Sequence, residues 1–174
     1  MRRLSNENPY QFKFLQKSVK QSPYLMIWGC FSAYGTGRLE IIESILNSDV
    51  YIKILEDRLK PSSEYFGIAD DFIFQDDSAP IHRAKKVKNW IEENNINTLP
   101  WPANSPDLNP IENLWKILKD KVHKKNPQSI AELKKVIVEI WRTEISIDLC
   151  EKLVLSMKSR ISSVLANNGG HTKY

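Results

Sequence analysis

Hydrophobic residues change their spacing along the chain, and the change predicts strands in the first half and helices in the second. Residues 24–31 form a continuous apolar run of strand length. After a turn cluster at 33–37, residues 38–42 alternate between apolar and polar side chains. Alternation with a period of two is typical of a strand, so the two segments are expected to form a hairpin. Two further short strands are predicted at 72–74 and 97–101.

Apolar residues elsewhere recur every three or four positions, which is typical of amphipathic helices. Ser48 and Asp49 can cap a first helix, and Pro61 is expected to end it. A second helix carries Val87 and Ile91 on one side. Three more helices are predicted from apolar stripes within residues 111–122, 130–141 and 149–164.

This order of elements predicts an α/β protein with a mixed sheet flanked by helices. Residues 1–23 are mostly polar and are expected to form an N-terminal tail, whereas residues 24–174 form one domain. A chain of 174 residues is long enough to bury a core of its own. Ser129 and Glu132 have the spacing of a capping box and mark the start of the helix over 130–141.

Composition narrows the class of protein only slightly. The chain has 25 Lys and Arg residues against 21 Asp and Glu, a net charge of +4 and a pI near 9.0. This mild excess is compatible with a nucleic acid partner but does not establish one. Two cysteines cannot form a disulfide framework, and neither a signal peptide nor a membrane-length apolar run is present. We therefore expect a soluble intracellular protein with no membrane partner.

Two acidic positions could hold a metal ion. Asp76 and Asp77 follow the predicted strand at 72–74, and carboxylates at a strand end suit a hard cation such as Mg²⁺. Neighbours in a strand point to opposite faces, so only one of the pair is expected to face a given site. A solvated turn is the alternative for an isolated Asp-Asp pair.

Glu112 and His82 each have an ordinary structural explanation. If Asn109 caps the helix and Pro110 begins it, Glu112 takes the place of a capping-box glutamate. Glu112 also lies at the edge of the apolar stripe, from which its carboxylate could reach a cleft. His82 follows the same turn as Asp77, and a lone histidine there is more often structural than catalytic.

Lysines cluster outside the apolar stripes of two predicted helices. Such clusters are usually a solvated face, but beside a phosphodiester-processing cleft they would provide phosphate contacts independent of sequence. The lysines of the two clusters are Lys85, Lys86 and Lys88, followed by Lys116, Lys119, Lys121, Lys124 and Lys125.

Several motifs together resemble those of mariner-type DDE transposases. Residues 101–115, WPANSPDLNPIENLW, resemble the family's signature around its third acidic residue. Residues 74–82, FQDDSAPIH, resemble the block around the second, which commonly reads FQQDNAPxH. This alignment selects Asp77 over Asp76, and 34 residues separate Asp77 from Glu112, as in one large branch of the family. MIWGCFS at 26–32 and GGHTKY at 169–174 extend the resemblance over roughly residues 24–174.

The resemblance implies an RNase H-like fold and metal-dependent DNA cleavage and strand transfer. Three carboxylates hold two Mg²⁺ or Mn²⁺ ions in such sites. Asp77 and Glu112 would be the second and third of these catalytic, metal-holding residues. Lys85, Lys86, Lys116 and Lys119 would contact DNA. The resemblance further implies transposon-end and target DNA as partners, a possible homodimer and action in the nucleus.

The match breaks at the first acidic residue. No aspartate precedes Asp49, which falls at a helix start instead of on the strand that carries the first aspartate in the family. The chain is therefore expected to be a C-terminal piece of a longer transposase that lacks the central, Asp-bearing strand. Its strand cleavage is expected to be feeble or absent. Residues 11–16 could fill the gap in the sheet.

Two alternatives follow from the incomplete triad. The chain could be a noncatalytic nucleic-acid-binding or protein-interaction module derived from a transposase. It could also be a nuclease completed by a strand from a partner chain. Metal-dependent nicking separates an enzyme from a binding module, and DNA binding that survives EDTA supports the module.

Overall fold

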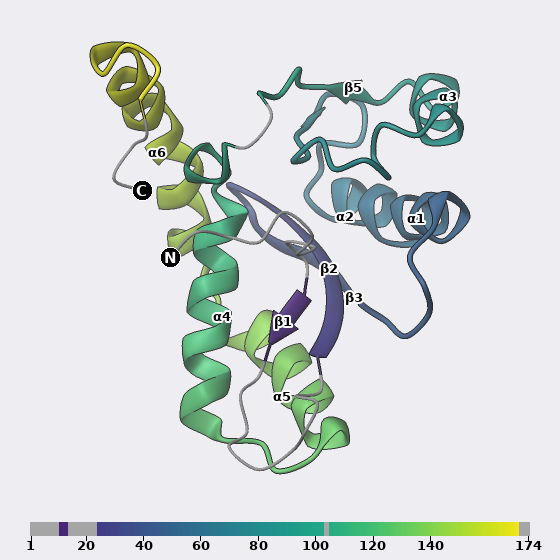
Figure 1. The fold of residues 1–174 in the computed structure, drawn as a ribbon, viewed down its shortest axis with the longest axis vertical. Coiled ribbons are helices and arrows are strands. Elements are labelled where there is room, and N and C mark those ends of the chain that lie inside the picture. Colours follow the sequence, from purple (N-terminus) through teal and green to yellow (C-terminus); the bar gives the residue numbers. More distant parts are fainter. Residues whose placement is uncertain (1–10, 14–23, 103–104, 171–174) are drawn as a thin grey trace.

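Strands and helices follow one another in the predicted order. The structure is a computed structural model that describes residues 11–13, 24–102 and 105–170. Figure 1 shows the strands of the first half enclosed by helices from both halves. The elements are β1 (Gln11–Lys13), β2 (Tyr24–Ser32), β3 (Gly35–Ile42), α1 (Ser48–Ile54), a π-helical turn (Leu55–Leu59), α2 (Lys60–Tyr65), β4 (Ile73–Phe74), α3 (Lys85–Glu93), β5 (Asn97–Thr98), a 3₁₀ turn (Pro106–Leu108), α4 (Ile111–Lys125), α5 (Ile130–Thr143) and α6 (Ile147–Ala166).

The predicted sheet is present in two pieces. β2 and β3 form the expected antiparallel hairpin, and β1 pairs antiparallel with the first three residues of β2. β4 and β5 form a separate parallel pair. Within the described residues, no strand pairing joins β2 to β4. The α/β class with helices flanking small sheets is thus confirmed. The absence of an Asp-bearing central strand stays a prediction, because residues 1–10 and 14–23 lie outside the described residues.

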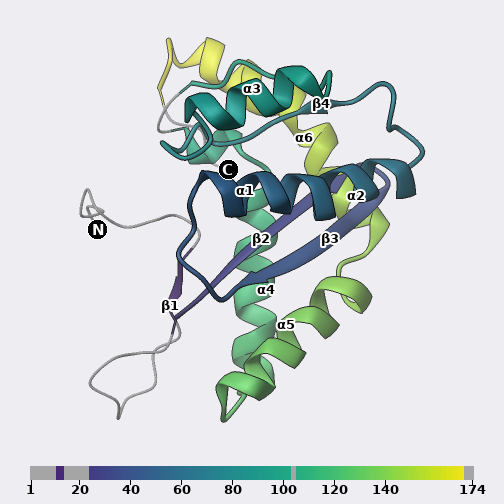
Figure 2. The same cartoon turned by 90° about the vertical axis from the view of Figure 1, so that its right-hand side faces the viewer.

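Alternation along β2 divides the core into two clusters. Figure 2 shows α1 and α2 over one face of the hairpin and α4 and α5 over the other. Ile27 is fully buried on the α4–α5 side, and its neighbour Trp28 is buried on the side of α1 and α3. Successive residues of a strand point to opposite faces, so one strand supplies both cores.

The helix that begins after β3 does not end at Pro61. Its N-cap is Asn47, whose side chain accepts hydrogen bonds from the N–H groups of Asp49 and Val50. The chain then widens into a π-helical turn, in which the Lys60 N–H donates to the Leu55 carbonyl. Proline cannot donate to the helical ladder and its ring crowds the preceding turn. The wider turn accommodates Pro61 at the start of α2, so the prediction of a break was wrong.

The later helices form as predicted, and Gly29 shapes their contact with the sheet. Trp115 of α4 and Trp141 of α5 stack with ring centroids 5.1 Å apart. A Cβ at Gly29 would lie 2.9 Å from Trp115 and 3.0 Å from Trp141, so only glycine lets both indoles approach β2. Ser129 accepts from the Glu132 N–H, as the capping box predicts. None of the described helices is long and apolar enough to cross a membrane.

Candidate metal centre

A cavity of about 280 Å³ lies between β2, the loop after β4 and the start of α4. Asp76, Asp77 and His82 line it from the β4 side, and Glu112 lines it from α4. Two of these residues, Asp77 and Glu112, are the predicted catalytic carboxylates. Residues far apart in the sequence thus meet in one cavity, as the family resemblance implies.

The Asp76–Asp77 turn brings both carboxylates to the same place. β4 ends at Phe74, and Ser78 takes a left-handed conformation with φ 59°. Asp76 Oδ1 accepts from the Ser78 N–H at 2.7 Å, and Asp77 Oδ1 accepts from the Ala79 N–H at 3.0 Å. The expectation that only one of the pair faces the site was wrong, because the two residues lie in a loop after the strand, where the alternation of a strand no longer applies.

His82 is the third member of this group. The backbone N–H of His82 donates to the Ala79 carbonyl at 2.9 Å. The chain therefore turns back, and the His82 side chain is buried against Asp77. His82 Nδ1 lies 3.0 Å from Asp77 Oδ1 and 3.8 Å from Asp76 Oδ1. The imidazole stacks on Tyr51 of α1 at 4.3 Å between centroids. Sequence reasoning gave His82 a structural role, and its place in the cavity shows that it also holds the acidic turn.

Opposing effects set the pKa values in this group. Desolvation disfavours the charged forms of both Asp76 and His82. For Asp76, the hydrogen bond and charge of His82 and the Ser78 N–H outweigh burial and lower the pKa of the carboxyl. For His82, hydrogen bonds and charges from Asp76 and Asp77 outweigh burial and raise the pKa of the imidazole above 6.5. The turn therefore favours a charged carboxylate beside a charged imidazole.

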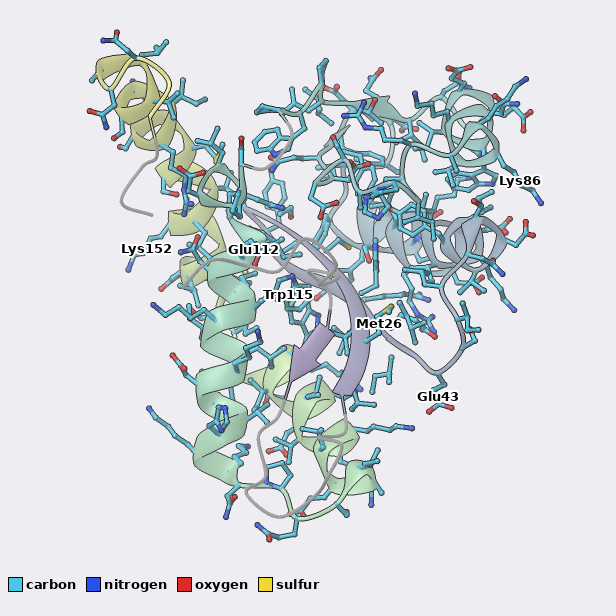
Figure 3. The ribbon with its side chains drawn as sticks, in the orientation of Figure 1. Met26, Glu43, Lys86, Glu112, Trp115 and Lys152 are labelled. Atoms are coloured by element: carbon cyan, nitrogen blue, oxygen red, sulfur yellow. The ribbon has the colours of Figure 1, made fainter. Side chains whose placement is uncertain are left out.

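Glu112 stands in the first turn of α4. Figure 3 shows it at the end of α4 nearest α6, one turn before Trp115, which points toward the sheet. The structure records no side-chain cap at this helix start, so the prediction that Asn109 caps it was wrong. The Asn109 Oδ1 instead accepts from Gln75 Nε2 at 3.3 Å. Since Gln75 directly precedes Asp76, this bond connects the loop that carries the aspartates with the segment that leads to Glu112.

The four predicted DNA-contacting lysines do not line the cavity. Lys85, Lys116 and Lys119 are exposed. Lys86 is exposed as well, and forms an ion pair with Asp49. Figure 3 places Lys86 on the side of the molecule away from Glu112. The lysines therefore belong to the outer surface of α3 and α4.

The donor set fits a hard divalent cation. One ligand atom each from Asp76, Asp77 and His82 lies within 4.8 Å of the other two. Glu112 is not one of these three residues, but it lines the same cavity and adds a carboxylate from α4. Carboxylate oxygens are the ligands that Mg²⁺ and Mn²⁺ prefer. Burial raises the pKa of the nearby Cys30 thiol to about 11, which keeps it protonated and a poor ligand at neutral pH.

Comparisons with known sequences identify the family. A sequence profile described as DDE superfamily endonuclease matches residues 15–134. The Tcb2 transposase of Caenorhabditis briggsae is 33% identical over 150 residues, and the Tc3 transposase of Caenorhabditis elegans is 35% identical over 152. Each match covers 86% of this chain but 54% and 46% of the relatives. The chain thus spans about half the length of these curated relatives.

Solved structures show the same fold. The Mos1 transposase catalytic domain with Raltegravir and Mn superposes with a TM-score of 0.79 at 20% identity, covering 94% of this chain and 82% of that one. A Mos1 paired-end complex with the left transposon end gives 0.78 at 21% identity, covering 98% and 52%. The fold is therefore RNase H-like. With the profile match over most of its length, the chain belongs to the DDE superfamily of endonucleases, as a domain related to the Tc1 and Tc3 transposases.

Proposed function

We propose that this domain carries a metal-dependent site for DNA strand cleavage and strand transfer, with Asp77 and Glu112 as its catalytic, metal-holding carboxylates. The observation that carries the proposal is that one cavity is lined by both Asp77, from the loop after β4, and Glu112, from the first turn of α4. Related Mos1 structures contain Mn or Mg, which supports Mg²⁺ or Mn²⁺ as the cofactor here.

The protein's own groups hold the reacting atoms in place. When bound, a divalent cation neutralises charge on a phosphodiester and lowers the pKa of a bound nucleophile. Asp77 is held toward the cavity by the Ala79 N–H and by His82. Glu112 is held by the buried stripe of α4, in which Trp115 packs one turn further on. Positioning and charge neutralisation are the main contributions that a protein makes to phosphoryl transfer.

DNA is the proposed substrate, and its phosphates would contact exposed lysines. Lys116 and Lys119 extend from the same helix as Glu112, and Lys85 and Lys86 extend from α3. The proposal further includes action on transposon-end and target DNA in the nucleus and assembly as a homodimer. A relative solved with a transposon end supports DNA as the partner.

Cleavage by this chain is expected to be weak, because no aspartate precedes Asp49 and the first of the three metal-holding carboxylates that the family resemblance implies therefore has no counterpart here. Nicking of supercoiled plasmid in Mg²⁺ or Mn²⁺ tests the proposal. Wild-type protein should nick slowly, and Asp77→Asn and Glu112→Gln should each abolish the residual activity. Equal nicking by wild type and both variants would refute the assignment of these carboxylates.

The same assay separates a noncatalytic binding module from an enzyme. A protein that shifts DNA in EDTA, but shows no metal-dependent nicking at any concentration, would act as a binding module. Its affinity should then fall steeply with salt, because phosphate contacts release counterions.

A further inference from the structure

Arg160 is a buried cation that the proposed site does not use. It lies on α6, which packs across the end of α4 that carries Glu112 (Figure 1). Only Cys150 and Arg160 are buried on this 20-residue helix, and Arg160 is 1% exposed. A buried guanidinium is costly unless hydrogen bonds replace its water, so its partners indicate what it does.

The guanidinium joins three segments through short hydrogen bonds. Nη1 donates to the Asp107 carbonyl at 2.6 Å, and Nη2 donates to Asn113 Oδ1 at 2.7 Å. Nε donates to Ser156 Oγ at 2.9 Å within α6 itself. Two of these acceptors lie on either side of Glu112 in the sequence. Arg160 therefore connects α6 to both the 3₁₀ turn before α4 and the first turn of α4.

The start of α4 depends on such contacts. No side chain caps this helix, and prolines at 106 and 110 remove backbone donors from the segment. Its direction is set by the Gln75–Asn109 hydrogen bond on the side of the aspartates and by Arg160 on the side of α6. The flat, multidentate guanidinium suits this task, because it fixes several acceptors in one plane.

We propose that Arg160 is a positioning residue for Glu112: it holds the first turn of α4 so that the Glu112 carboxylate faces the cavity shared with Asp77. The inference rests on the proposed metal site. It deepens that proposal, because it assigns the geometry of one metal-holding carboxylate to a third region of the chain.

Paired alanine variants separate positioning from stability. Asn113→Ala removes a hydrogen bond that crosses from α6 to α4, whereas Ser156→Ala removes one that stays within α6. Both truncate a side chain that bonds the same guanidinium. Arg160→Met removes the three hydrogen bonds described above and keeps an unbranched side chain of similar length. Glu112→Gln sets the effect of losing the carboxylate itself.

The first measurement is Mn²⁺ affinity from the electron paramagnetic resonance signal of free Mn²⁺, at a temperature where circular dichroism shows each variant folded. Arg160→Met and Asn113→Ala should weaken binding about tenfold, the scale at which groups behind a ligand act. The Mn²⁺ affinity of Ser156→Ala should stay within about twofold of wild type, even if its melting temperature falls as far as that of Asn113→Ala. Equal weakening by Ser156→Ala and Asn113→Ala, or unchanged affinity in Arg160→Met, would overturn the positioning role.

Hydrogen exchange in EDTA gives a second measurement that needs no metal. Peptides over residues 105–115 should exchange faster in Asn113→Ala and Arg160→Met than in wild type or Ser156→Ala. Unchanged exchange there would also overturn the proposal. If wild-type protein binds no Mn²⁺, the metal site itself is wrong and the positioning role fails with it. If wild type binds and Arg160→Met binds equally well, only the positioning role is wrong.

Discussion

The two faces of the β2–β3 hairpin present their carboxylates in different ways. On one face, Glu112 extends from a 15-residue helix whose buried stripe packs against α5. On the other, Asp76 and Asp77 lie in a loop held by backbone N–H groups, His82 and the Tyr51 ring. The helix that carries Glu112 is held by apolar packing along its length and by the Arg160 hydrogen bonds at its start, whereas the aspartate loop is held mainly by polar contacts. The cavity needs both the helix start that carries Glu112 and the loop that carries the aspartates. Because different contacts hold the two, a substitution can disturb one without the other.

The largest expected effect comes from the packed face. Gly29→Val should lower the free energy of unfolding by about 3 kcal/mol, because added carbons collide with Trp115 and Trp141 in a filled core. Urea denaturation measures this change. Gly67→Ala is the matched control, since no heavy atom lies within 4 Å of its added Cβ and only its φ of +69° opposes the change, at a cost of about 1 kcal/mol. A Gly29→Val protein as stable as wild type would show that the indoles do not pack closely on β2.

The polar face should respond to pH. The raised pKa of His82 means that its pairing with the aspartates stabilises the fold fully below pH 6.5 and is lost as the pH rises through the raised value. The lowered pKa of Asp76 means that the contribution of its carboxylate to stability is present above pH 3.8 and is lost as the pH falls through the lowered pKa. His82→Gln should therefore cost most, about 1.5 kcal/mol, between these limits.

Melts in EDTA from pH 4 to pH 9 measure this dependence. The difference between wild type and His82→Gln should shrink above pH 6.5. His123→Gln is the control, because His123 is an exposed histidine on α4 and its removal should change stability less. A His82→Gln difference that grows with rising pH would contradict the pairing.

The smallest effect is expected at the surface of α3. Lys86 and Asp49 form an ion pair, but their side chains are 64% and 69% exposed. Exposed pairs contribute little, so Lys86→Ala should cost less than about 0.5 kcal/mol in urea denaturation. Lys121→Ala should cost more, because Lys121 and its partner Glu144 are half-buried. A larger loss at Lys86 would mean that the polar face relies on this pair.

Local patterns were enough to predict the packed face. The stripe through Leu114, Trp115 and Leu118 predicted α4, and the capping box predicted α5, because each of these patterns is contained within a few consecutive residues. The family motifs picked out Asp77 and Glu112. Their meeting in one cavity follows from the fold that the motifs implied.

The polar face depended on contacts that sequence spacing does not contain. Asn109 bonds Gln75 instead of capping α4, and His82 turns back on Asp77 in the loop that follows β4. The helix continues past Pro61 because a π-helical turn directly precedes α2, instead of ending at the proline. Arg160 did leave a signal, since it lies on the apolar stripe of α6, three residues after Met157 and four before Val164. A charged residue on such a stripe predicts a buried, hydrogen-bonded cation.

The central claim is that carboxylates from both faces form one divalent-metal site. Melting temperatures of wild type, Asp77→Asn, Glu112→Gln and the double variant, each in EDTA and in millimolar Mn²⁺, test it most directly. Binding to the folded state should raise the wild-type melting temperature by about 2–6 °C, and each single variant should lose that rise. Because each single variant already loses the rise, the double variant should show the same melting-temperature response to Mn²⁺ as either single variant. A full rise in either single variant would mean that the two faces do not share a metal site.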